Sequence, residues 1–389
     1  MYPCWHGGRT GAGPDVLPRR TLLNQQVGST CPHILPTYLA PSNGTPVFPL
    51  ILIAAHPEMI KFSRTATYCR DMASCMAKYP FQSRQLLMDM RQWIRFGVFS
   101  LLCGIAALLI IAVGVGELLS GAVPTAVDSL SGAVSADFPV EGVQIPVSAN
   151  SRNTDSSVHG WLVRGRRGDG IILLVHSLRS NRIEMLSRAK FLNEQGYGVL
   201  LIDLRAHGET PGDRITFGLG EAEDVEASIA YLRNAFPGER IATIGVSLGA
   251  AAIVLSKHAP RLDAVVLESL HATFEEAVEN RLRLHLGEFG PVFSPLLLWQ
   301  LSFRFGTSPD ELSPINRIGD LNAPLLLISG TDDQHTKVAE TERLFEAARQ
   351  PKEIWVVPGG GHFNMHAYAG KEYENRISGF LERYLRRRN

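Results

Sequence analysis

Short stretches of uninterrupted apolar residues alternate with amphipathic stretches from about residue 155 onward. The apolar stretches have the length of strands and end at Gly, Ser or charged residues, which indicates strands that are buried on both faces. Between them, apolar residues recur with the period of an α-helix, as in RIEMLSRAKFLNEQG. The predicted strands are 160–165, 170–177, 198–204, 240–247, 262–269, 323–330 and 352–359. The predicted helices are 182–196, 221–236, 248–259 and 371–388.

This alternation predicts a mostly parallel, doubly wound sheet with helices on both faces. In such a sheet the crossovers are right-handed and ligands bind at the carboxyl ends of the strands. The alternation is interrupted over about residues 270–322. We expect this insertion to form a mostly helical cap over the strand ends. It is rich in aromatic residues, namely Phe289, Phe293, Trp299, Phe303 and Phe305.

One segment near the N-terminus is apolar throughout: FGVFSLLCGIAALLIIAVGVG, residues 96–116, carries no charge. It has about the 20 residues that an α-helix needs to cross a bilayer. Arg84, Arg91 and Arg95 precede it, and no basic residue follows before Arg152. The positive-inside rule then predicts a single-pass signal anchor with the C-terminal part on the non-cytoplasmic (periplasmic or extracellular) face. A cleaved signal peptide and a buried core helix are the alternatives, but the first usually has a shorter apolar core and the second a polar face.

The anchor divides the chain into parts of different composition. Residues 1–87 are rich in Pro, Gly, Ser, Thr, Cys and His without a sustained period. This indicates a disordered extension, or a translation product that starts upstream of the natural start at Met88 or Met90. The remaining parts are the anchor at 88–117, a small-residue linker with an edge strand at 118–150, and the folded domain at 151–389.

Charge and cysteine content narrow the chemistry of the folded domain. The chain has 38 acidic and 38 basic residues, so no nucleic-acid partner is expected. Its five cysteines all lie at or before Cys103, which excludes a disulfide, a zinc thiolate site and a cysteine nucleophile from the domain. We expect neither a metal nor an organic cofactor, and the sequence leaves the oligomeric state open.

Ser247 is the candidate nucleophile. It stands in the segment GVSLG between a predicted strand and a predicted helix. At such a turn the serine hydroxyl projects above the sheet, and the glycines at positions 245 and 249 prevent a collision between helix and strand. A serine that merely begins a helix would fit the same pattern. Residues further along the chain therefore have to decide between the two interpretations.

A serine nucleophile needs a histidine base that is oriented by a carboxylate. In this type of sheet the acid and then the base follow the serine, on loops after late strands. GTDDQHT offers Asp332 and Asp333 after one predicted strand, and GGGHF offers His362 after the last one. We favour Asp333 as the acid, with Glu268 at the end of an earlier strand as the alternative.

An oxyanion hole is expected beside the nucleophile. Its donors are the backbone amide of Leu248, at the start of the helix, and that of Leu178, in the loop after strand 170–177. We expect His176 to brace this loop. Arg179 and Arg182 lie nearby, and they are either solvated or positioned to meet an anionic group of a substrate.

These motifs follow the order found in the α/β-hydrolase superfamily. From about residue 155 to 388 the chain resembles its bacterial lipase/esterase-like and serine-aminopeptidase-like members. VHSLRSNR is similar to the oxyanion-loop motif, DLRAHGET to the D-x-R-G-H-G segment, GVSLGA to the nucleophile elbow, GTDDQHT to the acid loop and GGGHF to the base loop. The resemblance implies an α/β-hydrolase fold with a Ser-Asp-His triad, and Asp203, Arg205 and His207 that stabilise the loop after the fourth strand.

The chain departs from the family pattern at two positions. Ser177 replaces the glycine of the H-G pair, and this leaves the backbone path of the oxyanion loop in question. Ala206 replaces the glycine of R-G-H-G, a change that we expect to be harmless.

Together these observations predict a membrane-anchored serine hydrolase that cleaves a carboxylic ester or thioester through an acyl-enzyme. A small-molecule or lipid-like acyl compound is the expected substrate. Three alternatives remain open: an acyltransferase that uses the same residues, a serine peptidase or aminopeptidase-like enzyme, and a non-catalytic binding module on the hydrolase fold. An aminopeptidase would need a site for a free amine, and no suitable carboxylate pair stands out in the cap.

Overall fold

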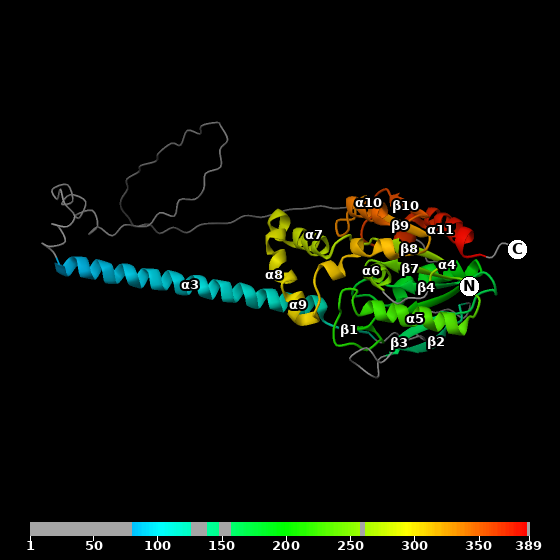
Figure 1. Cartoon of the computed structure of the whole chain (residues 1–389), viewed down its shortest axis with the longest axis horizontal. Coiled ribbons are helices and arrows are strands. Elements are labelled where there is room, and N and C mark those ends of the chain that lie inside the picture. The colour runs from blue at the N-terminus through cyan, green and yellow to red at the C-terminus, as the bar shows by residue number, and fades with distance from the viewer. Residues whose placement is uncertain (1–79, 126–137, 148–156, 257–260, 387–389) are drawn as a thin grey trace, which may run out of the picture. The chain divides into compact units, whose positions relative to one another are not determined.

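A computed structural model describes residues 80–125, 138–147, 157–256 and 261–386, with side chains from Asp89 onward. Its main element is an eight-stranded sheet with the spatial order β10-β9-β8-β7-β4-β5-β3-β2 (Figure 1). The strands are β2 (Glu141–Pro146), β3 (Ser157–Val163), β4 (Ile171–Val175), β5 (Gly198–Ile202), β7 (Ile241–Val246), β8 (Ala264–Glu268), β9 (Leu325–Gly330) and β10 (Lys352–Val357).

The strands of this sheet run mostly in parallel. All neighbours from β10 to β5 pair in parallel, whereas β3 pairs antiparallel with both β5 and β2. The strand order changes direction between β4 and β7, which makes the carboxyl ends of these two strands the expected place for a ligand. The predicted mostly parallel, doubly wound sheet is confirmed. A separate parallel pair joins β1 (Val123–Pro124) to β6 (His207–Gly208).

Helices cover both faces of the sheet because every other side chain of a strand points to the opposite face. Along β4, Ile171, Leu173 and Val175 belong to one core and Ile172 and Leu174 to the other. The first core packs against α5 (Glu221–Ala235), α6 (Leu248–Leu255) and α10 (Val338–Ala347). The second core packs against α4 (Leu186–Glu194) and α11 (Met365–Tyr384).

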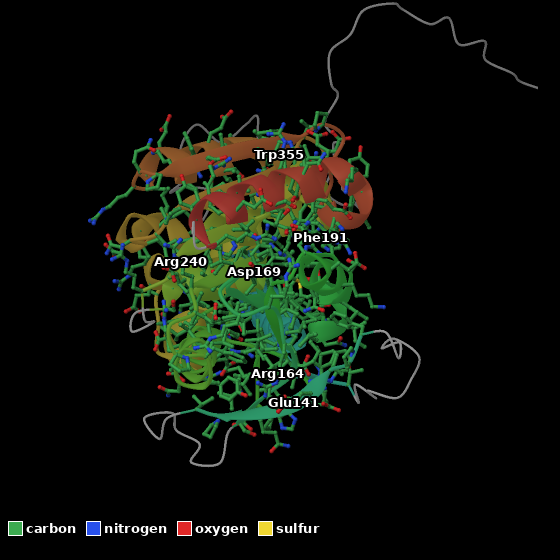
Figure 2. The ribbon with its side chains drawn as sticks, turned by 90° about the vertical axis from the view of Figure 1, so that its right-hand side faces the viewer. Glu141, Arg164, Asp169, Phe191, Arg240 and Trp355 are labelled. Atoms are coloured by element: carbon green, nitrogen blue, oxygen red, sulfur yellow. The ribbon has the colours of Figure 1, made fainter. Side chains whose placement is uncertain are left out.

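The outer edge of the sheet at β2 carries charged residues. Figure 2 shows Glu141, the first residue of β2, close to Arg164 just after β3. The Arg164 guanidinium donates to the Glu141 carboxylate over 3.1 Å, and both side chains are exposed. Charges on an exposed edge disfavour pairing with a strand from another chain.

Helices fill the interval between β8 and β9, where the sequence predicts a helical cap. The longer ones are α7 (Phe274–Leu286), α8 (Ser294–Leu298) and α9 (Gln300–Phe305), and a 3₁₀ helix, η3 (Gly287–Phe293), joins α7 to α8. Three further 3₁₀ turns lead into β9: η4 (Asp310–Leu312), η5 (Pro314–Asn316) and η6 (Ile318–Asp320). Another 3₁₀ turn, η2 (Arg182–Met185), precedes α4.

The apolar segment at 96–116 lies within a longer helix, α3 (Pro80–Ser120). Its part Asp89–Ser120 is long and apolar enough to cross a membrane, and its side chains are almost entirely exposed. The helix therefore extends several residues beyond the apolar run at both ends. Residues 1–79, which make up most of the segment interpreted as an extension or mis-start, lie outside the described residues.

A buried ion pair links α4 to the end of β8. The Arg188 guanidinium donates to both carboxylate oxygens of Glu268, over 2.6 and 3.1 Å. The Tyr373 hydroxyl of α11 donates to the same carboxylate over 2.5 Å. All three side chains are buried, so removal of either charge would leave the other without a partner in a medium of low polarity.

Replacement of this cation should therefore destabilise the fold strongly. We expect Arg188→Met to lower the free energy of unfolding by about 3–5 kcal/mol, because the Glu268 carboxylate loses its counter-ion. Lys371→Met is the matched control, since it removes a cation from the exposed pair with Glu374 and should cost less than about 1 kcal/mol. Urea unfolding of the full chain in mild detergent measures both values, and equal losses would contradict the expectation.

Candidate active site

Ser247 lies on a sharp turn between β7 and α6, as the sequence predicts. Its backbone has φ 51° and ψ −107°, a conformation that side chains rarely adopt. This strained conformation is maintained because β7 is fully buried in the sheet and α6 begins at the next residue. The Ser247 amide donates to the carbonyl of Glu268 over 2.9 Å, which ties the turn to the end of β8.

The glycines on either side of Ser247 are required by close contacts. A Cβ at Gly249 would lie 2.5 Å from the carbonyl oxygen of Val175, at the end of β4. A Cβ at Gly245 would lie 2.7 Å from the amide of Ala250 in α6. Both distances are shorter than any tolerable contact with backbone atoms, so larger residues would force α6 away from the strands.

The structure brings Ser247, His362 and Asp333 together. Nε2 of His362 lies 3.2 Å from Oγ of Ser247, and Nδ1 of His362 lies 2.9 Å from Oδ2 of Asp333. With a proton on Nδ1, the ring donates to Asp333 and leaves Nε2 to accept from the serine hydroxyl. Ser247 follows β7, Asp333 follows β9 and His362 follows β10, so all three lie at the carboxyl ends of parallel strands.

Asp333 is held ionised by its hydrogen bonds. Burial alone raises the pKa of this carboxyl, but the bond and charge of His362 and the donors of Thr336 lower it to about 2. Oδ1 accepts from the amides of His335 and Thr336, over 2.8 and 2.9 Å, and Oδ2 accepts from the Thr336 hydroxyl over 2.7 Å. A carboxylate with four donors keeps one position and orients the His362 ring.

The two other carboxylates that the sequence offers have different partners. Asp332 is exposed and accepts from the Thr331 hydroxyl over 2.9 Å. Glu268 is bound on both oxygens by Arg188 and also accepts from Tyr373. The geometry therefore favours Asp333 over both alternatives as the partner of His362.

Two backbone amides near Ser247 have the properties of oxyanion donors. Leu248 is the first residue of α6, where an amide has no acceptor within the helix. Leu178 lies in the loop after β4, two residues after His176, whose carbonyl oxygen would lie 2.7 Å from a Cβ at Gly249. Within the residues that the structure describes, neither amide donates a hydrogen bond to another protein group.

Histidines brace the loop that carries Leu178. The amide of Arg179 donates to Nε2 of His207 over 3.1 Å, and the amide of Leu204 donates to Nε2 of His176 over 3.0 Å. Burial, with the nearby His207 as the second cause, lowers the pKa of His176 to about 3. His176 is thus neutral and acts as an acceptor in the loop, in agreement with the bracing that the sequence suggests.

Ser177 makes, through its side chain, a hydrogen bond that a glycine could not make. Its amide and its hydroxyl both donate to Oε2 of Glu184, over 2.8 Å each. Glu184 lies in the short turn η2 just before α4. The departure from H-G therefore adds a hydrogen bond that ties the oxyanion loop to the start of the next helix.

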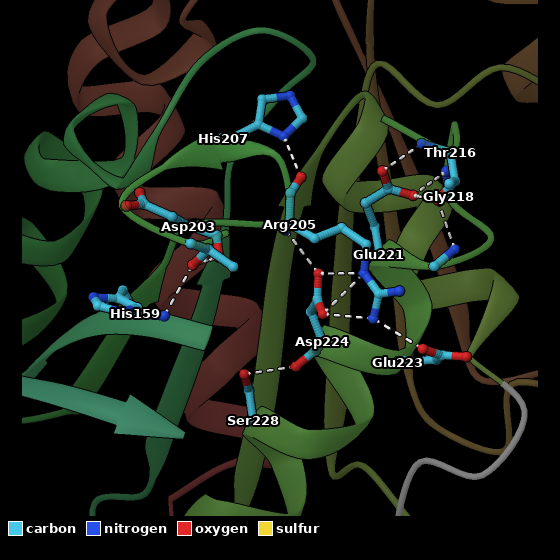
Figure 3. Close-up of polar contacts among 12 residues, drawn as sticks. His159, Asp203, Arg205, His207, Thr216, Gly218, Glu221, Glu223, Asp224 and Ser228 are labelled. Carbon is cyan, nitrogen blue, oxygen red and sulfur yellow. Dashed lines mark hydrogen bonds and ion pairs between the residues drawn. The ribbon is translucent and has the colours of Figure 1, made fainter. Parts of the chain in front are cut away.

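Ion pairs hold the segment DLRAHGET in place. Arg205 donates to Asp224 through its backbone amide and its guanidinium, and to Glu223, as Figure 3 shows. Asp203 accepts from the amide of Arg182 over 2.7 Å and from its guanidinium over 2.6 Å. Arg182 is therefore bound within the structure and is not available to contact a substrate.

Ala206 adopts φ 61°, the left-handed region that favours glycine. The expectation that this replacement is harmless is too simple, because an L-residue is strained there by about 1–2 kcal/mol. The Ala206 carbonyl accepts from the amide of Val123 over 2.7 Å, so the strained residue also supports the β1–β6 pair.

The sequence analysis does not assign three basic residues that lie near the triad, namely His335, His271 and Arg281. The His335 ring stacks on His362 with centroids 4.7 Å apart. Burial is the main cause that lowers the pKa of His335 to about 4 and that of His271 to about 3. Arg281 of α7 lies within electrostatic range of Asp333, and burial lowers its pKa. Of these residues only His335 lies in one of the motifs, GTDDQHT. Arg281 lies in α7, away from all of the motifs.

The site has the parts needed for nucleophilic attack on a carbonyl group. A serine hydroxyl, a base, an orienting carboxylate and two unpaired amides converge on one edge of the sheet. Within the described part of the chain, no group of three or more His, Cys, Asp or Glu side chains is placed to hold a metal ion.

Known proteins are similar to this chain in sequence or in fold. Two uncharacterized bacterial proteins are similar in sequence. YqkD of Bacillus subtilis is 26% identical over 229 residues, which are 58% of this chain and 75% of that protein. A protein of Mycobacterium tuberculosis strain H37Rv is 35% identical over 207 residues, 52% of this chain and 65% of that protein.

Among solved structures, an esterase from Pyrococcus furiosus has a TM-score of 0.53 at 23% identity, and covers 64% of this chain and 92% of the esterase. At this identity the likeness concerns the fold alone. The model of the alpha/beta hydrolase family matches residues 172–375, which is just over half of the chain. The chain therefore belongs to the alpha/beta hydrolase family.

Proposed function

We propose that the chain is a membrane-anchored serine hydrolase that cleaves a carboxylic ester or thioester. The observation that carries this proposal is the hydrogen-bonded series Ser247–His362–Asp333, with 3.2 Å and 2.9 Å between its members. Ser247 is strained and only 4% exposed, and strained residues cluster at active sites.

In the proposed reaction Oγ of Ser247 attacks the carbonyl carbon of the substrate while its proton passes to Nε2 of His362. The amides of Leu248 and Leu178 stabilise the oxyanion that forms. The tetrahedral intermediate breaks the bond to the leaving alcohol or thiol, which takes the proton from His362. Water then attacks the acyl-Ser247 ester with His362 as the base, and this step releases the acid and restores the serine.

Asp333 supports this reaction through charge and orientation. Its carboxylate stabilises the imidazolium that forms when His362 takes a proton, and it holds the ring with Nε2 toward Ser247. The four donors on Asp333 keep it ionised throughout. An apolar acyl compound is the proposed substrate because the adjoining cap exposes many apolar side chains.

The proposed anchor is the apolar part of α3. Asp89–Ser120 is long enough to span a bilayer and exposes its apolar side chains. Arg91 and Arg95 precede the uncharged run, so the proposed orientation has the hydrolase domain on the non-cytoplasmic face.

Covalent labelling tests the nucleophile directly. A fluorophosphonate probe reacts with activated serines, and we expect stoichiometric labelling of the full chain in detergent. The variant Ser247→Ala should fold normally and remain unlabelled. Folded wild-type protein that takes up no probe would contradict the proposal and favour a binding module.

The role of Asp333 has two measurable consequences. Asp333→Asn should lower kcat on any accepted ester by about 10⁴-fold, because the amide stabilises the wrong tautomer of His362. Because the pKa of Asp333 is lowered to about 2, its ionised form stabilises the fold above about pH 4 and loses this effect as the pH falls toward 2. The wild type should therefore lose about 2 kcal/mol more than Asp333→Asn between pH 5 and pH 2. Urea unfolding at each pH measures this difference, and parallel curves would count against it.

A reporter enzyme tests the orientation. Alkaline phosphatase fused after Asn389 should be active in cells, since this reporter matures only outside the cytoplasm. The same reporter fused after Arg95, before the apolar run, should be inactive. Activity of the second fusion alone would reverse the proposed topology.

A further inference from the structure

Side chains of α9 bind the C-terminal end of α3. The Gln300 amide donates to the carbonyl of Ala112 over 2.9 Å. The Arg304 guanidinium contacts Glu117 over 2.9 Å and donates to the Ser120 hydroxyl over 2.8 Å. Gln300 and the side chain of Arg304 are buried by this contact. The cap is thus attached to α3 through one face of α9.

This contact sets the depth of α9 along α3. The uncharged run ends at Gly116, so Ala112 lies one helical turn, about 6 Å, inside its end. The run of residues 96–116 is about 30 Å long as a helix, which equals the thickness of the hydrocarbon core. If α3 spans the bilayer, Gln300 lies at the boundary of the hydrocarbon and Arg304 lies at the level of the headgroups.

The polar groups of Gln300 are satisfied without water. Its amide nitrogen donates to the carbonyls of Ala112 and Leu296, and its oxygen accepts from Arg304 over 3.1 Å. A side-chain amide that has such partners can enter a region of low polarity, whereas an unpaired one cannot. The contact is therefore suited to the depth at which α3 would place it.

Two exposed aromatic side chains lie at the same depth. Trp299 and Phe303 immediately precede Gln300 and Arg304, so they lie about 100° around α9 from the face that contacts α3. They are 57% and 59% exposed, and their rings stack with centroids 5.0 Å apart. Tryptophan and other aromatic residues are enriched where a protein meets the interface of a membrane.

The same cap exposes further apolar residues. We use the term cap patch for its large exposed apolar side chains: Leu284, Leu286, Phe289, Val292, Phe293, Trp299 and Phe303. Phe289 and Val292 are 81% and 73% exposed. Apolar side chains gathered in this way on a surface mark a site of contact with a membrane or another protein.

We propose that the cap patch inserts into the membrane interface and that the enzyme takes its substrate, an acyl ester with its chain in the bilayer, from that surface. The proposal rests on the anchor and the hydrolase activity proposed above. The bilayer is favoured as the occupant because the α9 end of the patch adjoins α3, whose own apolar side chains are exposed. Helix α7 connects the patch to the triad, since it carries Leu284 and Leu286 as well as Arg281, which lies within electrostatic range of Asp333.

Spin labels in the full chain test the insertion. The five native cysteines are replaced by serine, and single cysteines are labelled in vesicles of phosphatidylcholine and phosphatidylglycerol. We expect Phe303→Cys to be accessible to oxygen and protected from a water-soluble nickel chelate. Leu108→Cys in the apolar run should behave alike. Asn322→Cys, exposed at the opposite edge of the sheet just before β9, should be fully accessible to the chelate.

Each other result has a definite meaning. Chelate access at position 303 equal to that at 322, with 108 protected, would overturn the insertion and leave the anchor intact. Chelate access at position 108 as well would refute the anchor itself. Protection of position 303 from both oxygen and chelate would indicate a protein contact, such as a second copy of the chain, and would also overturn the proposal.

Kinetics on two substrates test the route of entry. Phe303→Glu should lower hydrolysis of a long-chain monoacylglycerol in vesicles by about tenfold, because a carboxylate is disfavoured in the interface, and leave hydrolysis of soluble p-nitrophenyl butyrate unchanged. Asn322→Glu adds the same charge away from the patch and should change neither rate. Equal losses on both substrates for Phe303→Glu would overturn the proposed route. Absence of any hydrolysis by the wild type would refute the proposed activity, and the labelling experiment would still decide the insertion.

Discussion

Helix α6 begins so close to the end of β4 that a methyl group on Gly249 would lie 2.5 Å from the carbonyl oxygen of Val175. This close approach positions most of the site. It forces the chain through the strained turn at Ser247, and it brings the amide of Leu248 next to the loop that carries Leu178. The approach itself depends on the strand order, since β4 and β7 are neighbours although β5 and β6 come between them in the chain. The topology of the sheet is therefore the condition for the geometry of the site.

The sequence predicted the fold class and the loops from which the residues of the site come. Ser247 directly follows β7, and Asp333 and His362 lie in the loops after β9 and β10; the carboxyl ends of parallel strands lie at one edge of a sheet. Residues that follow the carboxyl ends of parallel strands can therefore be expected to lie close together in space. The choice of Asp333 over Asp332 required more, because only the loop conformation decides which carboxylate faces His362.

Contacts that depend on how distant helices pack could not be predicted from the sequence. Arg188 stands in an amphipathic helix where a charge normally faces water, yet it pairs with Glu268, 80 positions later, inside the core. Arg281 and His271 come near the triad only because the cap folds back over the strand ends. The left-handed backbone of Ala206 could not be predicted for another reason. A glycine at this position would have indicated a positive φ, whereas an alanine does not.

The contact between Gln300 and Ala112 joins residues that are 188 positions apart. At a synthesis rate of about 5–20 residues per second, α9 leaves the ribosome about 10–40 s after the end of α3. The strands β1 to β8 and the helices α7 and α8 are made during this interval, so α9 reaches the helix after most of the sheet has been synthesised. Segments that are made before α9 already contact the end of α3, because the Arg179 guanidinium donates to the carbonyl of Leu118 and the amide of Ile215 donates to that of Ser120. During biogenesis the cap therefore adds a later attachment, one that reaches further back along the helix to Ala112.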